Sequence, residues 1–549
     1  MKIKTRYRVH STLFTVILLF AAILRLTALG SNPAHLTSDE AALGVNAYSI
    51  LKTGRDEHGA FLPVIFESFG DWKPGLYVYS AIPIVAVFGL TEFAVRLPSA
   101  MAGVVAVYLI YKLVRSLRPG GDNWALLAAL LLAVNPWHIH FSRGAWEANL
   151  ALTITLGAIL AFYKSFGDKK YIFLSAVLFV LTLWTYQGAK LATSIVVLAL
   201  TVANYKSLIN FDKKYLSYAT VTGVLIAAPI VLSLFQGKTG RLAVFSVFSY
   251  TRSEADIWKI LSQDDLNGPN FVFSLFHSEQ WNLARGVMGR YFNYFAGKFL
   301  FFEGDWANAR HSSPNIGYLL YADFAALIFG LYLLFRKKIT PQNGFVLLWL
   351  VLAPLPGALS RDSVNGVRTL NMVIPLVLVA SLGLSVLITK VKSKLFYLAL
   401  AGAYVFSFVL YLDAFWIHAP VDNSRFWQYG YKQMVAMIGD DHERYNEIVI
   451  PQSFDQPYIF FLFYSPELLS EKREFEPSEF GDVGLVTKLG NVSFRMVNWS
   501  SDREKTGSVV VTAPTGIDLG DLKGNPDKFD YELISYLNGA PAFYLVKPK

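Results

Sequence analysis

The sequence predicts an all-α membrane domain of about eleven transmembrane helices, followed by a C-terminal α/β domain. Its 549 residues are 54% hydrophobic and only 16% charged, whereas a soluble protein carries about 25% charged residues. The apolar residues form continuous runs of about 18 or more residues, long enough to cross a bilayer as helices. These runs do not alternate with polar residues, which excludes a membrane barrel. After residue 420, short β-rich runs replace the long apolar ones.

The positions of the spans follow from the apolar runs. We expect the spans at about 11–29, 93–115, 123–140, 147–165, 171–186, 190–205, 215–235, 313–335, 342–359, 368–389 and 394–416. The net charge of +9 comes from short basic clusters beside the runs, which is the pattern of topology signals and not of a surface for nucleic acid. The basic N-terminus is therefore expected in the cytoplasm, followed by an uncleaved first span.

One apolar stretch, 75–90, is left out of this count. Counting it would place the next basic clusters outside, whereas leaving it out places five basic loops in the cytoplasm. At about 16 residues the stretch is also short for a full crossing. We therefore expect it to dip into the outer leaflet and return. The transmembrane domain, 1–419, then has two long outer loops, 30–92 and 236–312, and the domain 420–549 is extracytoplasmic.

The C-terminal region differs from the rest of the chain. Short β-rich runs alternate there with polar turns and helical stretches, at 447–450, 492–497, 508–512 and 542–546. This alternation is typical of a small α/β domain. The chain contains no cysteine, so disulfides, thiolate nucleophiles and cysteine-bound metals are excluded.

Two adjacent carboxylates, Asp39 and Glu40, follow the first span. Acids beside a membrane are costly unless they are solvated, paired or functional, so the pair is either solvated at the interface or part of a site. A helical stretch begins here and runs to about Gly54. Because a helix dipole favours a carboxylate at its N-terminus, such an acid is held in place and is suited to act as a base.

Two cations on the outer side are candidates for binding a lipid phosphate. Lys73 precedes the 75–90 stretch at headgroup level, where it either snorkels or binds phosphate. Arg368 opens an apolar helix at the outer boundary, where it either anchors the helix or binds phosphate through its forked guanidinium. An arginine on the outer side runs against the usual charge bias, which favours function.

The turn after the third span, 135–147, adds further polar side chains. It places Arg143 and Glu147 at the outer boundary, where they either serve a site or pair with each other. His138 and His140 are candidate ligands of a divalent metal cation together with Glu147, or else interfacial anchors. The sequence leaves the use of a metal open.

These motifs, in this order, resemble the GT-C superfamily of membrane glycosyltransferases, in particular the protein O-mannosyltransferase and aminoarabinose-transferase group. The likeness covers about residues 1–200 well and is weaker over 300–420. It is carried by TSDE at 37–40, WKPGLY at 72–77, FAVRLPSA at 93–100 and FSRGAWE at 141–147. The weaker matches are GYLLY at 317–321 and Arg368 followed by Ile374 and Pro375.

The resemblance implies both a fold and a chemistry. It implies that Asp39 is the catalytic carboxylate, that Lys73 helps to hold the donor phosphate and that Glu147 is a second acid of the site. It also implies a polyprenyl-phosphate-linked sugar donor, one-step inversion and a re-entrant stretch at 75–90. The family often has a second proline where this chain has Gly75, so the turn beside the lysine departs from the pattern.

The expected reaction is attack of an acceptor hydroxyl on the anomeric carbon of the lipid-linked sugar. Asp39 takes the proton, with Glu40 or Glu147 orienting it or the acceptor. The departing phosphate needs positive charge rather than a strong acid. Candidates for supplying this charge are Lys73, Arg143 and Arg368. A divalent cation is an alternative source.

Two other functions compete with transfer. A transporter or flippase of a lipid-linked sugar would place its ionisable residues near the bilayer midplane, often in paired repeats. Here they lie mainly at the outer boundary, and the sequence has no internal repeat. A polysaccharide polymerase or ligase with a similar layout is the third reading. The sugar, and whether the acceptor is protein, lipid or glycan, are left open.

Overall fold

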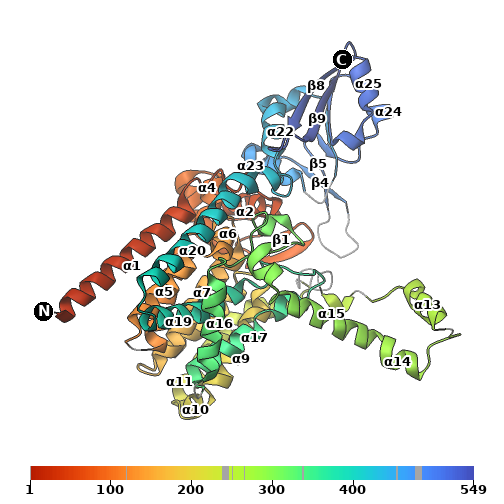
Figure 1. The fold of residues 1–549 in the computed structure, drawn as a ribbon. Coiled ribbons are helices and arrows are strands. Elements are labelled where there is room, and N and C mark those ends of the chain that lie inside the picture. The colour runs from red at the N-terminus through yellow and green to blue at the C-terminus, as the bar shows by residue number, and fades with distance from the viewer. Residues whose placement is uncertain are drawn as a thin grey trace.

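The computed structural model describes residues 2–118, 120–237, 246–249, 251–264, 266–336, 339–452, 456–476 and 485–549. Figure 1 shows a bundle of helices with a sheet at one end and a helical arm that extends away from the bundle. The arm consists of α13 (Glu254–Gln263), α14 (Phe271–His277) and α15 (Glu279–Asn293).

The bundle contains the helices that, among the described residues, are long and apolar enough to cross a membrane. Its helices are α1 (Lys2–Leu26), α2 (Ser38–Thr53), α3 (Leu76–Phe88), α4 (Glu92–Leu117), α5 (Asp122–Val134), α6 (Pro136–Arg143), α7 (Glu147–Ser165), α8 (Tyr171–Leu183), α9 (Ala189–Ala203), α10 (Tyr205–Ile209), α11 (Lys213–Phe235), α16 (Asp323–Arg336), α17 (Pro341–Leu352), α18 (Leu355–Ala358), α19 (Val373–Lys390), α20 (Lys394–Asp413) and α21 (Ala419–Asp422). Each of the eleven stretches expected to span the membrane contains a helix, although the stretch 313–335 becomes helical only at Asp323.

The length of these helices limits how many spans the structure supports. Among the described residues, five helices are long and apolar enough to cross a bilayer, or six when α5 and α6, which meet at a 55° bend, count as one span. Four shorter apolar helices accompany them, and α3 is one of these. The chain is therefore a multi-pass membrane protein, while the count of eleven spans and the re-entrant position of 75–90 stay predictions.

Small residues bring two of the central helices together. A side chain at Gly330 of α16 would collide with the backbone carbonyl of Val379 in α19, and one at Gly383 of α19 would collide with the carbonyl of Ala326. In lipid, helices associate through such close backbone packing because the hydrophobic effect does not drive it. The pair forms part of the largest buried core.

The C-terminal sheet has seven strands in the order β4-β5-β6-β3-β7-β9-β8. Its strands are β3 (Glu447–Ile450), β4 (Arg473–Glu476), β5 (Leu485–Leu489), β6 (Val492–Phe494), β7 (Ser508–Thr512), β8 (Phe529–Ser535) and β9 (Pro541–Pro548). The helices of this region are α22 (Tyr431–Ile438), α23 (Tyr458–Tyr464), α24 (Trp499–Asp502) and α25 (Leu519–Gly524). The central strand β3 runs parallel to both neighbours, β6 and β7. All four predicted strands are present, which confirms the C-terminal sheet.

One apolar core joins this sheet to the bundle. Phe463 of α23 packs so closely on α2 that a side chain at Gly44 would overlap its ring and a methyl group of Val95 in α4. The same core includes buried residues of α3 and of the strands β3 and β7. The sheet is therefore seated on α2, the helix whose N-terminus carries the adjacent carboxylates. The boundary near residue 420 stays a prediction.

Candidate active site

Helix α2 begins where the sequence places its two acids. Thr37 caps the helix: its hydroxyl accepts a hydrogen bond from the Glu40 amide, and the Glu40 carboxylate accepts one from the Thr37 amide at 3.0 Å. This reciprocal capping box fixes the first turn. Asp39 lies between the two capping residues, and 52% of its side chain is exposed. The helix therefore holds Asp39 rigidly while leaving its carboxylate open to a ligand.

Glu40 has the opposite environment. The residue is only 4% exposed and pairs with Arg96 of α4, with 2.9 Å between Oε1 and Nε. The same Oε1 accepts a hydrogen bond from the Ala145 amide at 2.8 Å. Arg96 in turn donates to three backbone carbonyls of the loop that precedes α2. Glu40 thus ties together α2, α4 and the turn before α7, which makes it a positioning residue.

A short hairpin carries Lys73 to Asp39. Strands β1 (Ile65–Ser68) and β2 (Asp71–Pro74) pair antiparallel, and both turn residues, Phe69 and Gly70, have positive φ, as the tightest hairpin turns require. The Lys73 ammonium forms an ion pair with the Asp39 carboxylate. Burial lowers the pKa of Lys73, but Asp39 and then Glu147 outweigh it, so the pKa lies above its ordinary value.

Glu147 completes a group of charges around this lysine. It is the first residue of α7 and interacts electrostatically with Lys73, Asp39 and Asp71. The structure therefore brings together three of the predicted site residues from three separate elements: α2, the β1–β2 hairpin and α7.

Lys190 is a cation of this site that the sequence analysis missed. It lies in the first turn of α9, where a helix dipole disfavours positive charge. Its Nζ is buried and has no hydrogen-bond partner among the residues that the structure describes, and it interacts electrostatically with Asp71. A lone lysine opening an apolar helix is the same signal that drew attention to Arg368.

Arg368 is held at the edge of a small pocket between α7 and α9. Its guanidinium pairs with Asp362 at 2.7 Å, and it lines the pocket with Leu152, Thr155 and Thr193, among others. Tyr186, a further lining residue, interacts electrostatically with both Arg368 and Glu147. The pocket is therefore lined mainly by apolar and uncharged polar side chains, with Arg368 as its charged member.

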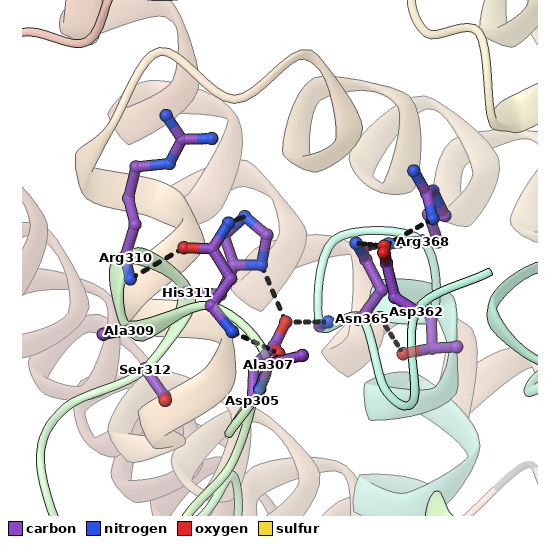
Figure 2. A network of polar contacts seen from close by, with 12 residues as sticks. Asp305, Ala307, Ala309, Arg310, His311, Ser312, Asp362, Asn365 and Arg368 are labelled. Atoms are coloured by element: carbon purple, nitrogen blue, oxygen red, sulfur yellow. Dashed lines mark hydrogen bonds and ion pairs between the residues drawn. The ribbon is translucent and has the colours of Figure 1, made fainter. Parts of the chain in front are cut away.

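A buried network holds the Arg368 turn in place (Figure 2). Asp305 accepts hydrogen bonds from the amide of Gly366 at 2.8 Å and from the imidazole of His311 at 2.7 Å. Burial lowers the pKa of His311, although Asp305 acts in the opposite direction. The network joins the segment 305–311 to the turn that presents Arg368.

Arg143 does not join the charged group around Lys73. Its guanidinium is buried and donates to the backbone carbonyls of Leu24, Thr27, Ala28 and Asn32. It also stacks over the ring of Trp416, with 4.5 Å to the centroid. These contacts engage Arg143 in closing the end of α1, and the prediction that it binds phosphate has no support from its position.

The candidate metal ligands are also engaged elsewhere. His138 is buried against the Arg25 guanidinium, 2.7 Å from Nδ1 to Nη2, and His140 bonds through Nε2 to the Arg310 carbonyl at 2.9 Å. Among the described residues, no three histidine, aspartate or glutamate side chains converge to hold a metal ion. His138, His140 and Glu147 therefore do not form the ligand set that the sequence allowed, because two of them point into the protein interior.

Gly75 explains the departure from the family pattern at the lysine turn. Its amide donates to the Val64 carbonyl at 2.9 Å, a bond that proline lacks. A side chain at this position would overlap the ring of Phe66, which is the strand partner of Lys73. Glycine is therefore the residue that lets the hairpin close on α3.

The variant Gly75→Ala is expected to lower stability by about 1–3 kcal/mol, because the added methyl overpacks a buried ring. The melting temperature of the purified protein, compared with that of Gly402→Ala, measures this effect. A side chain at Gly402 meets no atom within 4 Å, and its backbone is helical. Equal melting temperatures for Gly75→Ala and the wild type would contradict the close packing.

The chain resembles known proteins in part of its sequence and in its fold. Residues 73–232 match the family of dolichyl-phosphate-mannose-protein mannosyltransferases. The matched segment includes Lys73 and Glu147 and begins after Asp39. No curated protein sequence matches the chain.

Solved structures are similar over nearly the whole chain. ArnT from Cupriavidus metallidurans bound to undecaprenyl phosphate is 13% identical, with a TM-score of 0.57, over 98% of this chain and 97% of that one. The archaeal oligosaccharyltransferase AglB from Archaeoglobus fulgidus, in complex with an inhibitory peptide and a dolichol-phosphate, is 13% identical, with a TM-score of 0.51, over 98% and 74%. At these identities the likeness concerns the fold. The chain therefore shares the fold of ArnT and AglB, and its residues 73–232 match the mannosyltransferase family.

Proposed function

We propose that the chain transfers a sugar from a polyprenyl-phosphate carrier to an acceptor hydroxyl at the extracytoplasmic face of the membrane. The observation that carries this proposal is the Asp39–Lys73 pair, with Glu147 beside it, next to the α7–α9 pocket. One base and several cations are what transfer from a phosphate leaving group needs. The similarity to ArnT, which was solved with undecaprenyl phosphate, supports a lipid-linked donor.

In this mechanism the donor phosphate binds among the cations at the rim of the pocket, and its prenyl chain stays in the bilayer. Lys73, Lys190 and Arg368 supply the positive charge. Lys73 pairs with Asp39, and the phosphate of the donor competes with this carboxylate for the ammonium. Asp39 is then released from its ion pair with Lys73 and can act as the base, so that donor binding activates the base.

The chemical step is a single displacement. The acceptor oxygen attacks the anomeric carbon while Asp39 takes its proton, and the bond from that carbon to the phosphate oxygen breaks. The phosphate leaves with the electron pair, which the cations stabilise. Glu147 orients Lys73 or the acceptor. Because Asp39 acts as a base and not as a nucleophile, the configuration of the anomeric carbon inverts.

Purified protein supplied with labelled undecaprenyl-phosphate sugars and with membranes of the source cell tests this function. The expected result is release of undecaprenyl phosphate together with label on a new product. A panel of hexose, pentose and aminopentose donors identifies the sugar. Movement of the intact lipid between leaflets, without cleavage of any donor, would overturn the proposal in favour of transport.

Replacing either site lysine is expected to weaken the reaction without unfolding the protein. Lys73→Met should lower kcat about 10²–10³-fold, the usual effect of removing one group that stabilises a developing charge. Its ion pair is partly exposed, so the loss of stability should stay below about 1 kcal/mol. Lys190→Met should mainly raise KM for the donor. The folded structure should change little, because the Lys190 ammonium has no hydrogen-bond partner to lose among the described residues.

Lys169→Met is the matched control for these variants, because Lys169 also forms a partly exposed ion pair, with Asp212, outside the site. The donor-dependent rates of the three variants are compared after their melting temperatures have been shown to be equal. A Lys73→Met rate equal to that of Lys169→Met would remove Lys73 from the mechanism.

A further inference from the structure

A second cavity, of about 480 Å³, lies between the C-terminal sheet and the helical bundle. One wall is formed where the parallel strands β3 and β7 end, at Ile450, Pro451 and Ala513. The other walls come from the segment before α22 and from the loop around Arg310. Ligands of open α/β sheets bind beyond the carboxyl ends of parallel strands, and this volume is typical of small-molecule sites.

Two residues that line the cavity contact the chain neighbours of the proposed catalytic acids. Gln428, a lining residue, accepts a hydrogen bond from the Ser38 amide at 2.6 Å, and Ser38 precedes Asp39. The guanidinium of Arg310, also a lining residue, lies over the Trp146 ring at 5.9 Å, and Trp146 precedes Glu147. In Figure 2 the Arg310 side chain extends away from the Asp305 network. A ligand in this cavity would therefore meet side chains that contact the chain neighbours of both acids.

The lining combines aromatic faces with planar hydrogen-bond donors. Phe426 is 50% exposed, and Tyr429 and Phe543 are partly buried beside it. Arg310 and Arg425 contribute guanidinium groups, and Nε of Arg310 is buried without a hydrogen-bond partner among the described residues. Aromatic rings pack against the C–H faces of sugar rings, and guanidinium groups donate to several hydroxyls in one plane.

The position of the cavity favours a saccharide over an extended peptide. A peptide that binds to a sheet adds a strand at an edge, where backbone groups are unpaired. The edges of this sheet are β4 and β8, whereas the cavity lies mainly at the ends of β3 and β7 and meets the β8 edge only through Tyr536, in the turn after that strand. Its polar contacts must therefore come mainly from side chains, which suits a ligand whose hydroxyls point in several directions.

We infer that this cavity binds a saccharide, the carbohydrate part of the acceptor, and presents its hydroxyl toward Asp39. Describing the saccharide as an acceptor rests on the proposed function, whereas saccharide binding itself does not. The two statements are separated by measuring binding without any donor and transfer with one.

The binding test uses the full-length protein in detergent micelles and three probes: mannotriose, cellotriose and a hexapeptide rich in serine and threonine. Ligand-observed NMR titration is expected to show a trisaccharide binding with a Kd in the millimolar range. Phe426→Ala and Arg425→Ala should each weaken this binding about tenfold. Tyr531→Ala, which removes another partly exposed aromatic ring of the C-terminal region, should leave it unchanged.

Three results would overturn the inference: no binding of either trisaccharide, binding of the peptide alone, or saccharide binding that Phe426→Ala leaves intact. The transfer assay then reports on the proposed function separately. Phe426→Ala should raise KM for the acceptor while KM for the donor stays as in the wild type. Trisaccharide binding that needs Phe426, in a protein that cleaves no donor, would sustain the cavity as a saccharide site and refute the transferase.

Discussion

Asp39→Asn is expected to lower sugar transfer by about 10²–10⁴-fold, the range that a general base contributes, while the protein folds normally. The amide has nearly the shape of the carboxylate but does not take the proton of the attacking hydroxyl. The Asp39 side chain is 52% exposed, so losing its ion pair with Lys73 should change stability by less than about 1 kcal/mol. The first turn of α2 keeps its cap, which depends on Thr37 and Glu40.

Single-turnover rates with labelled donor, measured beside the melting temperature, separate catalysis from folding. The Asp39→Asn protein should still bind the donor, because the phosphate then meets Lys73 without a competing carboxylate. A variant that transfers sugar as fast as the wild type would show that another group takes the proton. Glu147→Gln, measured in the same way, identifies whether that group is the second acid of the site.

Glu40→Gln is expected to affect stability rather than chemistry. It should lower the free energy of unfolding by about 3–5 kcal/mol, because it leaves the buried Arg96 guanidinium without its counter-charge. Arg96 is fully buried, so water cannot replace the carboxylate. The change also weakens the capping box of α2 and the bond to the Ala145 amide. Any loss of activity should therefore follow the loss of folded protein.

Thermal unfolding and the yield of monodisperse protein measure this effect. Asp122→Asn is the matched control, because Asp122 forms a partly exposed ion pair with Arg115, and it should cost less than about 1 kcal/mol. A Glu40→Gln protein that melts like the wild type yet transfers no sugar would instead assign Glu40 to the chemistry. The adjacent acids thus form a pair of experiments with opposite expected outcomes.

Local signals in the sequence predicted the helices and three candidate site residues that lie together in the structure. Continuous apolar runs predicted helices at all eleven positions, and β-rich runs predicted four strands, of which β3 and β7 have the expected limits. Asp39, Lys73 and Glu147 each stood at the start of a helix or beside a turn, where chain direction alone places them near one boundary. In the structure, Asp39 and Glu147 both act on the Lys73 ammonium, which agrees with that expectation.

Other site assignments receive no support from the structure, because residue type does not reveal burial. Arg143 and Arg368 were both predicted to lie at the outer boundary of the membrane. In the structure, Arg143 is enclosed by backbone carbonyls, whereas Arg368 lines a pocket. The two histidines looked like metal ligands, but their rings point toward Arg25 and toward the Arg310 carbonyl. Lys190 was overlooked because its partner, Asp71, is distant in the chain.

A multi-pass helical protein with a C-terminal sheet could be predicted from the residues, because hydrophobic run length and β-rich patterning are properties of short segments. Which of two neighbouring carboxylates is open to a ligand depends on how the chain folds. Packing against α4 draws Glu40 onto Arg96, and the β1–β2 hairpin brings Lys73 to Asp39. Burial and charge pairing depend on segments that are far apart in the chain, so the roles of adjacent, chemically similar residues emerge only when the chain is folded.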